Sequence, residues 1–142
     1  MDKNNEPVKR GGIVMEKRVV FCMIFIFALS LSLAQELTVE EMQFCTAIEE
    51  RQPAGVDTAF TSTVERVYCF TKINGASDTT TIAHVWYYNN EEMAKVELTI
   101  KGKTWRTWSS KKIMEDWQGN WKVDVINANG DVLKSGEFII KP

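Results

Sequence analysis

The most chemically suggestive stretch of the sequence reads TWRTWSSK, between residues 104 and 111. Its indole, cationic and hydroxyl groups suit binding rather than catalysis, because an indole can stack on the apolar face of a sugar ring while polar groups bind its hydroxyls. On a β-strand, alternation places Arg106, Trp108 and Ser110 on one face and Trp105 on the other. We therefore expect Arg106, Trp108, Ser110 and Lys111 to form part of a ligand-binding surface for a carbohydrate or a similar polar polymer.

This stretch leaves alternatives open. A half-buried strand hides only one of its two faces. We expect both Trp105 and Trp121 to lie in the core, because each heads an apolar-alternating segment. Trp108 would then form a cation–π pair with Arg106 at the surface. In the alternative interpretation, Arg106 and Lys111 only tie loops to backbone carbonyls.

Groups that could catalyse a reaction are scarce. The sequence has one histidine and lacks the HExxH, Gly-x-Ser-x-Gly and P-loop motifs. Carboxylates such as Glu91, Glu97 and Asp116 lie in segments typical of solvated turns and edges, and no pair stands out as the acid and base of a glycosidase. We expect no enzyme activity, no cofactor and no metal site. A net charge of −2 with 25% charged residues also gives no basic excess for binding nucleic acid.

The histidine, His84, has two interpretations. On a regular strand it shares a face with Trp86 and Tyr88, which would make it a candidate for a functional role. Alternatively Trp86 is the core tryptophan of a sandwich, and His84 is then half-buried and structural. We favour the structural role.

The N-terminal region predicts export. Residues 15–34 have the layout of a secretory signal peptide: a positively charged start, the apolar run Val19–Leu33, and small residues before a cleavage site after Ala34. The alternative is an uncleaved anchor, but the run is shorter than the about 20 residues that span a membrane. Residues 1–14 are a polar extension, and translation from Met15 would omit them. We expect a periplasmic or extracellular protein that meets the membrane only through this segment before cleavage.

Export changes the interpretation of the cysteines. Cleavage leaves two of the three, Cys45 and Cys69. In an oxidising compartment such a pair indicates a disulfide, which would stabilise the fold by about 3–4 kcal/mol in the chain-entropy model. A metal or redox site is the weaker alternative, because no CxxC occurs.

The remaining sequence predicts strands. Residues 35–43 are expected to form a linker, in which Glu36 to Met42 is a short helix or irregular, and residues 44–142 form the domain. Asn-Gly and Asn-Asn turn signals separate apolar-alternating or β-branched segments, which cover 64–73, 80–88, 94–101, 104–111, 121–125 and 132–141. We predict an all-β fold, an antiparallel immunoglobulin-like β-sandwich of seven to eight strands behind the signal peptide.

Several short segments of the sequence resemble those of a bacterial family, the domain-of-unknown-function family 2914. They are VYCFTKI at 67–73, HVWYY at 84–88, WRTWSSK at 105–111 and GNWKV at 119–123, and the resemblance extends from Phe44 to Ile140. The resemblance implies a small extracytoplasmic β-domain, of a kind often attached to longer exported or membrane proteins. It implies no activity, because the family has none assigned.

Two functions remain as hypotheses. The first is a non-catalytic module that binds a cell-envelope glycan or polysaccharide through a tryptophan–arginine surface, which requires two exposed aromatic rings side by side. The second is a protein-interaction or structural domain of the cell envelope, which requires a broad apolar patch or a long bare edge strand. Neither involves nucleic acid.

Overall fold

Every regular element in the described part of the chain is a β-strand. The structure is a computed structural model and describes residues 36–142, so the predicted extension 1–14 and signal peptide 15–34 lie outside the described residues. The strands are β1 Thr38–Cys45, β2 Ala47–Glu49, β3 Gln52–Ala54, β4 Ala59–Thr61, β5 Arg66–Asn74, β6 Thr80–Tyr88, β7 Glu91–Ile100, β8 Thr104–Lys112, β9 Gly119–Asn127 and β10 Val132–Lys141. The predicted all-β class is confirmed. The number exceeds seven to eight because β2, β3 and β4 are three-residue strands in a region without clear alternation.

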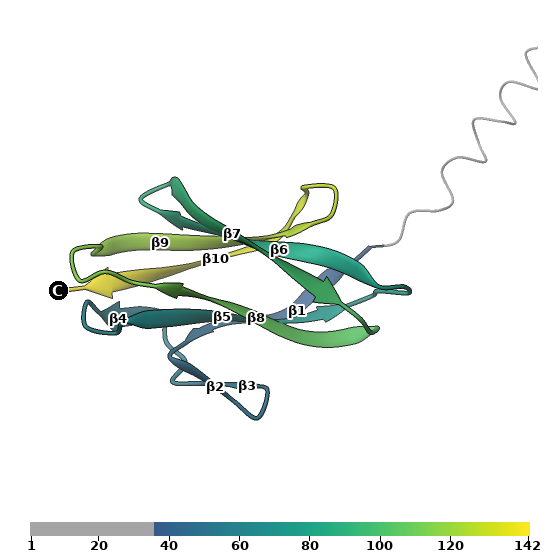
Figure 1. Ribbon diagram of the computed structural model, residues 1–142, viewed down its shortest axis with the longest axis horizontal. Helices are drawn as coiled ribbons and strands as arrows, with labels where there is room; N and C mark the ends of the chain where they lie inside the picture. Colours follow the sequence, from purple (N-terminus) through teal and green to yellow (C-terminus); the bar gives the residue numbers. More distant parts are fainter. Residues whose placement is uncertain (1–35) are drawn as a thin grey trace, which may run out of the picture. The chain divides into compact units, whose positions relative to one another are not determined.

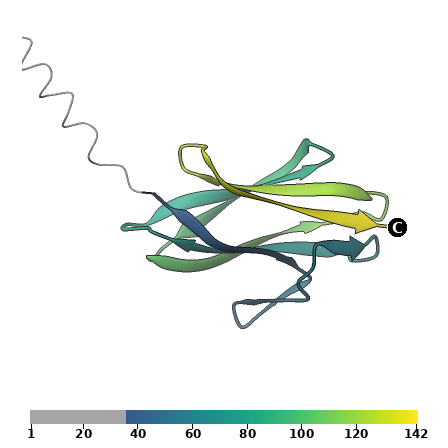
Figure 2. The same cartoon turned by 180° about the vertical axis from the view of Figure 1, so that it is seen from behind.

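The strands form two layers and a projecting hairpin. One sheet has the order β1-β5-β8 and the other β4-β10-β9-β6-β7, while β2 and β3 pair separately. Figures 1 and 2 show the two sheets face to face, with hairpin β2–β3 extending from the layer that contains β5 and β8. All pairs are antiparallel except β4 with β10, which is parallel. Strands β1, β5 and β8 follow the A-B-E order of an immunoglobulin sandwich, and β6, β9 and β10 follow C-F-G. The predicted sandwich is therefore confirmed, with one parallel pair added.

Strand β1 corrects the predicted linker. It begins at Thr38, inside the 35–43 range, and pairs with β5. A bulge between Val39 and Glu41 shifts the register, so that Val39 and Met42 both face the core although they lie three residues apart. The bulge removes the period of two by which a strand is recognised in sequence.

The core between the sheets is aromatic at one end. Phe138 stacks on Trp121 with ring centroids 5.9 Å apart and contacts Phe44 at 4.7 Å. Trp86 and Trp121 are fully buried, so the core position predicted for Trp121 is correct. Trp105 packs against the aliphatic cluster at the other end but stays half-buried, because β8 is an edge strand.

Candidate functional site

The predicted surface on β8 lies at the edge of the β1-β5-β8 sheet. Register places Arg106, Trp108 and Ser110 on one face of β8, and Trp105 on the opposite face together with Ser109, which is buried between the sheets. Arg106, Trp108 and Ser110 are each half-buried. The alternation predicted for these three residues is therefore what the structure shows.

Lys111 and Ser110 have other partners. Lys111 lies on the inner-facing register of β8, opposite Val67, and its Nζ is 5.1 Å from the ring centroid of Trp117. Arg66 donates a hydrogen bond to the Ser110 hydroxyl at 2.8 Å. The structure thus separates Lys111 from the outer face of the strand and engages Ser110 in a contact within the protein.

The cation beside Trp108 is Arg51 and not the expected Arg106. The Arg51 guanidinium carbon lies 5.6 Å from the Trp108 ring centroid and 5.7 Å from that of Trp105. Its Nη2 donates a hydrogen bond to the backbone carbonyl of Arg106 at 3.2 Å. One guanidinium therefore joins two half-buried indoles across the edge of β8. Such cation–π contacts contribute about 0.5–1 kcal/mol at exposed sites.

Arg51 reaches this place from the turn of hairpin β2–β3. Glu49 pairs with Gln52, so Glu50 and Arg51 are the two turn residues, with φ of 51° and 63°. Residues with a Cβ are disfavoured in this left-handed region. The turn could not be predicted from the residues Glu50 and Arg51, because two-residue hairpin turns are recognised by asparagine and glycine. Strand β8, which Arg51 contacts, also lies far from Arg51 along the chain.

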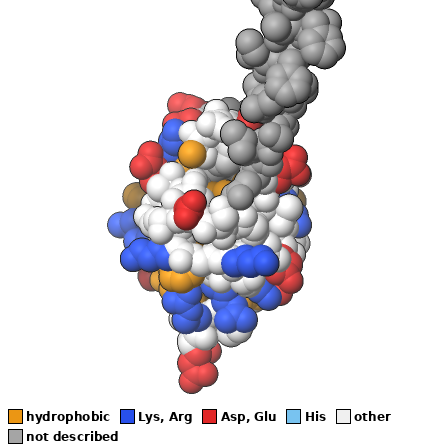
Figure 3. All heavy atoms as spheres, turned by 90° about the vertical axis from the view of Figure 1, so that its right-hand side faces the viewer, with side chains coloured by type: hydrophobic (Ala, Val, Ile, Leu, Met, Phe, Trp, Pro, Cys, Tyr) orange, Lys and Arg blue, Asp and Glu red, His pale blue; other side chains and the backbone are white. Residues whose placement is uncertain are grey.

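Positive charge gathers around the two indoles. Lys72 on β5 lies directly opposite Arg106 in the ladder, and Glu40 is 3.6 Å from the Lys72 Nζ. Figure 3 views the molecule from its right-hand end in Figure 1, and lysine and arginine side chains gather in the lower half of that end. We call Arg51, Lys72, Trp105, Arg106 and Trp108 the indole–arginine surface. It combines apolar rings with cationic groups, and the carboxylate of Glu40 lies beside Lys72 at its margin.

His84 is structural, as we favoured, and is more deeply buried than the half-buried position expected. It is fully buried, with Nδ1 2.6 Å from the Ser109 hydroxyl and Nε2 3.2 Å from that of Thr71. Thr71 donates its hydroxyl proton to the carbonyl of Thr107, and Trp86 donates its indole N–H to Ser109. The hydroxyl of Thr71 must then accept from Nε2–H, and Ser109 donates to Nδ1, so the imidazole is neutral and both nitrogens are satisfied.

This network links the two sheets. His84 and Trp86 lie on β6, whereas Thr71 and Ser109 lie on β5 and β8. Burial lowers the pKa of the His84 imidazole to about 4. A serine that donates to a histidine resembles a nucleophile–base pair, but here both groups are buried and fully engaged. The arrangement fixes the packing of the core.

The two cysteines are free thiols, so the structure does not contain the expected disulfide. Phe44 is the residue that pairs with Cys69, and alternation therefore points the side chain of Cys45 to the opposite face of the sheet. Cys45 lies near the backbone of hairpin β2–β3, and burial raises its pKa. Burial likewise raises the pKa of Cys69, with a smaller effect of the neighbouring Cys45. Both thiols are buried and predominantly protonated at neutral pH.

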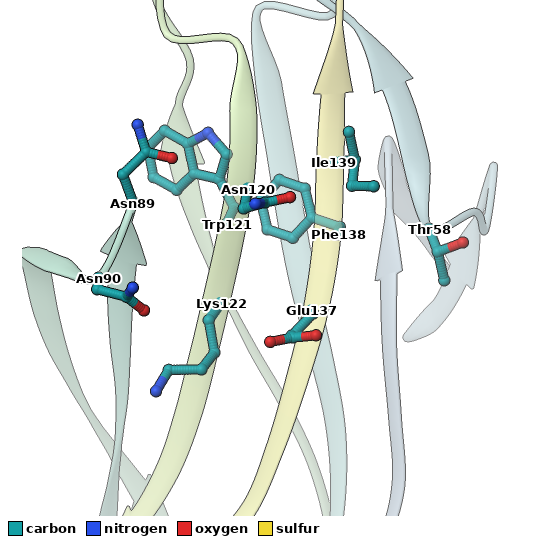
Figure 4. Close-up of a pocket in the computed structure, with 9 residues that line it drawn as sticks. All are labelled: Thr58, Asn89, Asn90, Asn120, Trp121, Lys122, Glu137, Phe138 and Ile139. Carbon is teal, nitrogen blue, oxygen red and sulfur yellow. The ribbon is translucent and has the colours of Figure 1, made fainter.

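A second surface feature lies on the five-stranded sheet. An open hollow of about 560 Å³ lies beside the β6–β7 turn, and Figure 4 shows its polar lining residues, which include Asn90, Asn120, Lys122 and Glu137. Its two aromatic lining residues, Trp121 and Phe138, are each only 1% exposed and pack into the core. The hollow therefore offers polar contacts but no aromatic ring on which a ligand can stack.

Within residues 36–142, histidine, cysteine and carboxylate side chains form no group of three or more that could hold a metal ion. In the same residues, no helix has the length and apolar character needed to cross a membrane.

Comparison with known proteins gives one family match and weak structural likenesses. The model of the family described as "Protein of unknown function (DUF2914)" matches residues 79–140. No curated protein matches the chain. A β-glucosidase from Listeria innocua in complex with glucose is similar in structure, with a TM-score of 0.47 and 13% identity over 77% of this chain and 16% of that chain. A β-glucosidase from Kluyveromyces marxianus has a TM-score of 0.45 and 10% identity, over 78% of this chain and 15% of that chain. The chain thus spans only a small part of the length of either enzyme.

Proposed function

We propose that the chain, whose residues 79–140 match the model of the DUF2914 family of unknown function, is a non-catalytic, exported module that binds a cell-envelope glycan or polysaccharide. The ligand would lie on the indole–arginine surface of β5, β8 and hairpin β2–β3. A β-sandwich with this surface at an accessible edge supplies a rigid platform for such binding.

The observation that carries this proposal is the pair of half-buried indoles joined by Arg51. A sugar ring has an apolar face that stacks on an indole and hydroxyl groups that accept hydrogen bonds from a guanidinium. Trp105 and Trp108 supply two rings, and Arg51 and Arg106 supply donors at their margin. The two rings are half-buried and lie on opposite faces of β8, but one guanidinium contacts both, and this combination supports a glycan site at the strand edge.

Two features support a non-catalytic, exported role. His84, the one histidine of the sequence, is buried with both ring nitrogens hydrogen-bonded, which leaves it no part in acid–base chemistry at the surface. The signal-peptide pattern of residues 15–34 supports export, which would place the domain where envelope glycans occur.

A protein-interaction domain is the second candidate. Strand β8 is an edge strand, and an exposed edge can add a strand from a partner. However, Arg51 already binds the Arg106 carbonyl on that strand, which interrupts the row of free backbone groups. The exposed large apolar residues, Val56, Met114, Val132 and Ile139, lie in separate segments of the described chain. These features favour the glycan over a partner strand added at β8.

A glycan array probed with the mature protein tests the proposal. We expect Trp108→Ala to lose most of the binding, with an unchanged circular dichroism spectrum. The matched control is Tyr87→Ala, because Tyr87 also forms a cation–π pair, with Lys122 at 4.8 Å, but on the other sheet. Wild-type binding that survives Trp108→Ala would exclude this surface. If the wild type binds no glycan, the protein-interaction candidate becomes the better one.

A further inference from the structure

The turn of hairpin β2–β3 holds an arginine where the backbone disfavours one. Glu50 and Arg51 both have positive φ, whereas the corresponding turn between β6 and β7 uses Asn89 and Asn90. Asparagine tolerates this conformation and arginine rarely adopts it. Backbone strain of this kind persists only where surrounding contacts maintain it, and it concentrates at functional sites. The strained turn therefore makes the Arg51 side chain a candidate functional group.

The Arg51 guanidinium is fixed before any ligand arrives. Two indoles lie 5.7 and 5.6 Å from it, and the carbonyl of Arg106 accepts one hydrogen bond from it. The residue remains exposed to solvent. A guanidinium has more N–H donors than this bond uses, and a group that is already ordered loses little entropy on binding. Arg51 thus has the properties of a preorganised donor.

Carboxylates neutralise the cations at this surface only in part. Arg106 and Lys72 lie directly opposite each other on adjacent strands, an arrangement that destabilises a sheet when both are positive. Glu40 pairs with Lys72. Among the residues that the structure describes, no carboxylate pairs with Arg51 or Arg106. An anionic ligand would relieve this repulsion.

We propose that the indole–arginine surface recognises an anionic group of a polysaccharide, a carboxylate or a phosphate, and that Arg51 is the residue that binds it. This inference rests on the glycan-binding function proposed above. Guanidinium groups hold carboxylates and phosphates through two parallel N–H···O bonds. Arg106 adds a second cation beside the first, while Trp105 and Trp108 contact the sugar that carries the anion.

Binding of three soluble polymers to the mature protein tests this inference. The probes are polygalacturonate, which carries carboxylates, poly(glycerol phosphate), which carries phosphates, and uncharged dextran. We expect one of the two anionic polymers to bind, and the one that binds identifies the source of the anion. Binding should weaken as salt is raised from 50 to about 500 mM, because salt screens exposed charges. Arg51→Lys keeps the charge but loses the planar fork, and should weaken binding by about tenfold.

Two further variants separate binding from folding. Arg51→Gly suits the left-handed turn and should bind as poorly as Arg51→Ala while keeping the thermal midpoint of the wild type. Lys134→Ala, a cation on β10 of the other sheet, is the control and should bind like the wild type. If dextran binds as well as the anionic polymers, or if Arg51→Gly binds like the wild type, the anion inference is overturned while the glycan function stands. If wild type binds none of these polymers and no glycan on the array, both are overturned.

Discussion

At the scale of single residues, the buried His84 makes stability depend on pH. Its imidazole is neutral in the folded protein, with a pKa of about 4, against about 6.5 in an unfolded chain. Between these values the unfolded state binds more protons, so the free energy of unfolding falls as the pH falls. Stability is full above about pH 6.5 and declines toward pH 4, and the total loss is about 3 kcal/mol.

Urea unfolding measured from pH 4 to 7 checks this prediction. In His84→Gln, the free energy of unfolding should no longer show the part of its pH dependence that is due to the imidazole, whatever the overall stability of the variant. Carboxylates titrate near the lower end of the range in both proteins, so the difference between the two curves is the relevant quantity. Parallel curves for wild type and variant would show that His84 is not neutral and buried in solution.

The tryptophans provide a second prediction at this scale. Trp121 is 1% exposed and stacks on Phe138, so Trp121→Ala leaves a core cavity and should destabilise the fold by about 3–5 kcal/mol. Trp108 is half-buried, and its cation–π partner is the exposed Arg51, so Trp108→Ala should destabilise less. Guanidinium unfolding of the two variants gives the comparison. Equal losses would mean that Trp108 supports the core as much as Trp121 does.

At the scale of elements, two glycines in turns separate conformational from steric effects. Gly75 and Gly130 both have positive φ, of 104° and 88°. A Cβ on Gly75 would lie 2.6 Å from the backbone oxygen of Glu36, whereas a Cβ on Gly130 would meet nothing within 4 Å. Both alanine substitutions force a disfavoured backbone conformation. Gly75→Ala should therefore destabilise by about 1–3 kcal/mol more than Gly130→Ala.

Thermal melting of both alanine variants beside the wild type measures this difference. A similar loss for the two variants would indicate that the segment around Glu36 moves away from the β5–β6 turn without a penalty. That result would also weaken the assignment of the N-terminal segment to the ordered domain.

Elements could be predicted from sequence where local signals agreed. Strands β6 and β10 lie at their expected positions, Thr80–Tyr88 and Val132–Lys141, because turn residues precede both segments and β-branched and aromatic residues fill the first. Strand β1 was missed because its bulge shifts Met42 out of alternation. The face of β8 that carries Trp108 was predicted, but its partner Arg51 was not. No local pattern connects a turn residue with a strand that follows so much later in the chain.

At the scale of the whole molecule, sheet order explains what the sequence could not show. Strand β1 pairs with β5, and β4 pairs with the last strand, β10. The chain between them crosses from one sheet to the other, and hairpin β2–β3 is formed in this crossing. The indole–arginine surface therefore depends on the crossing segment, which carries Arg51, as well as on β8. Strand order follows from long-range pairing and is not encoded in the alternation of any one strand.

The last prediction concerns where the folded domain begins. A protein that starts at Glu36 retains β1, whereas one that starts at Phe44 lacks nearly all of it. The second protein loses three partly buried side chains, Leu37, Val39 and Met42, each contributing on the order of 1–2 kcal/mol. The loss of about 3–6 kcal/mol is comparable with the whole stability of a small domain. We expect the protein from Glu36 to melt cooperatively and the one from Phe44 to lack a cooperative transition, as followed by tryptophan fluorescence and near-ultraviolet circular dichroism. Equal thermal midpoints would show that β1 is dispensable and that residues 35–43 act as the linker that the sequence predicted.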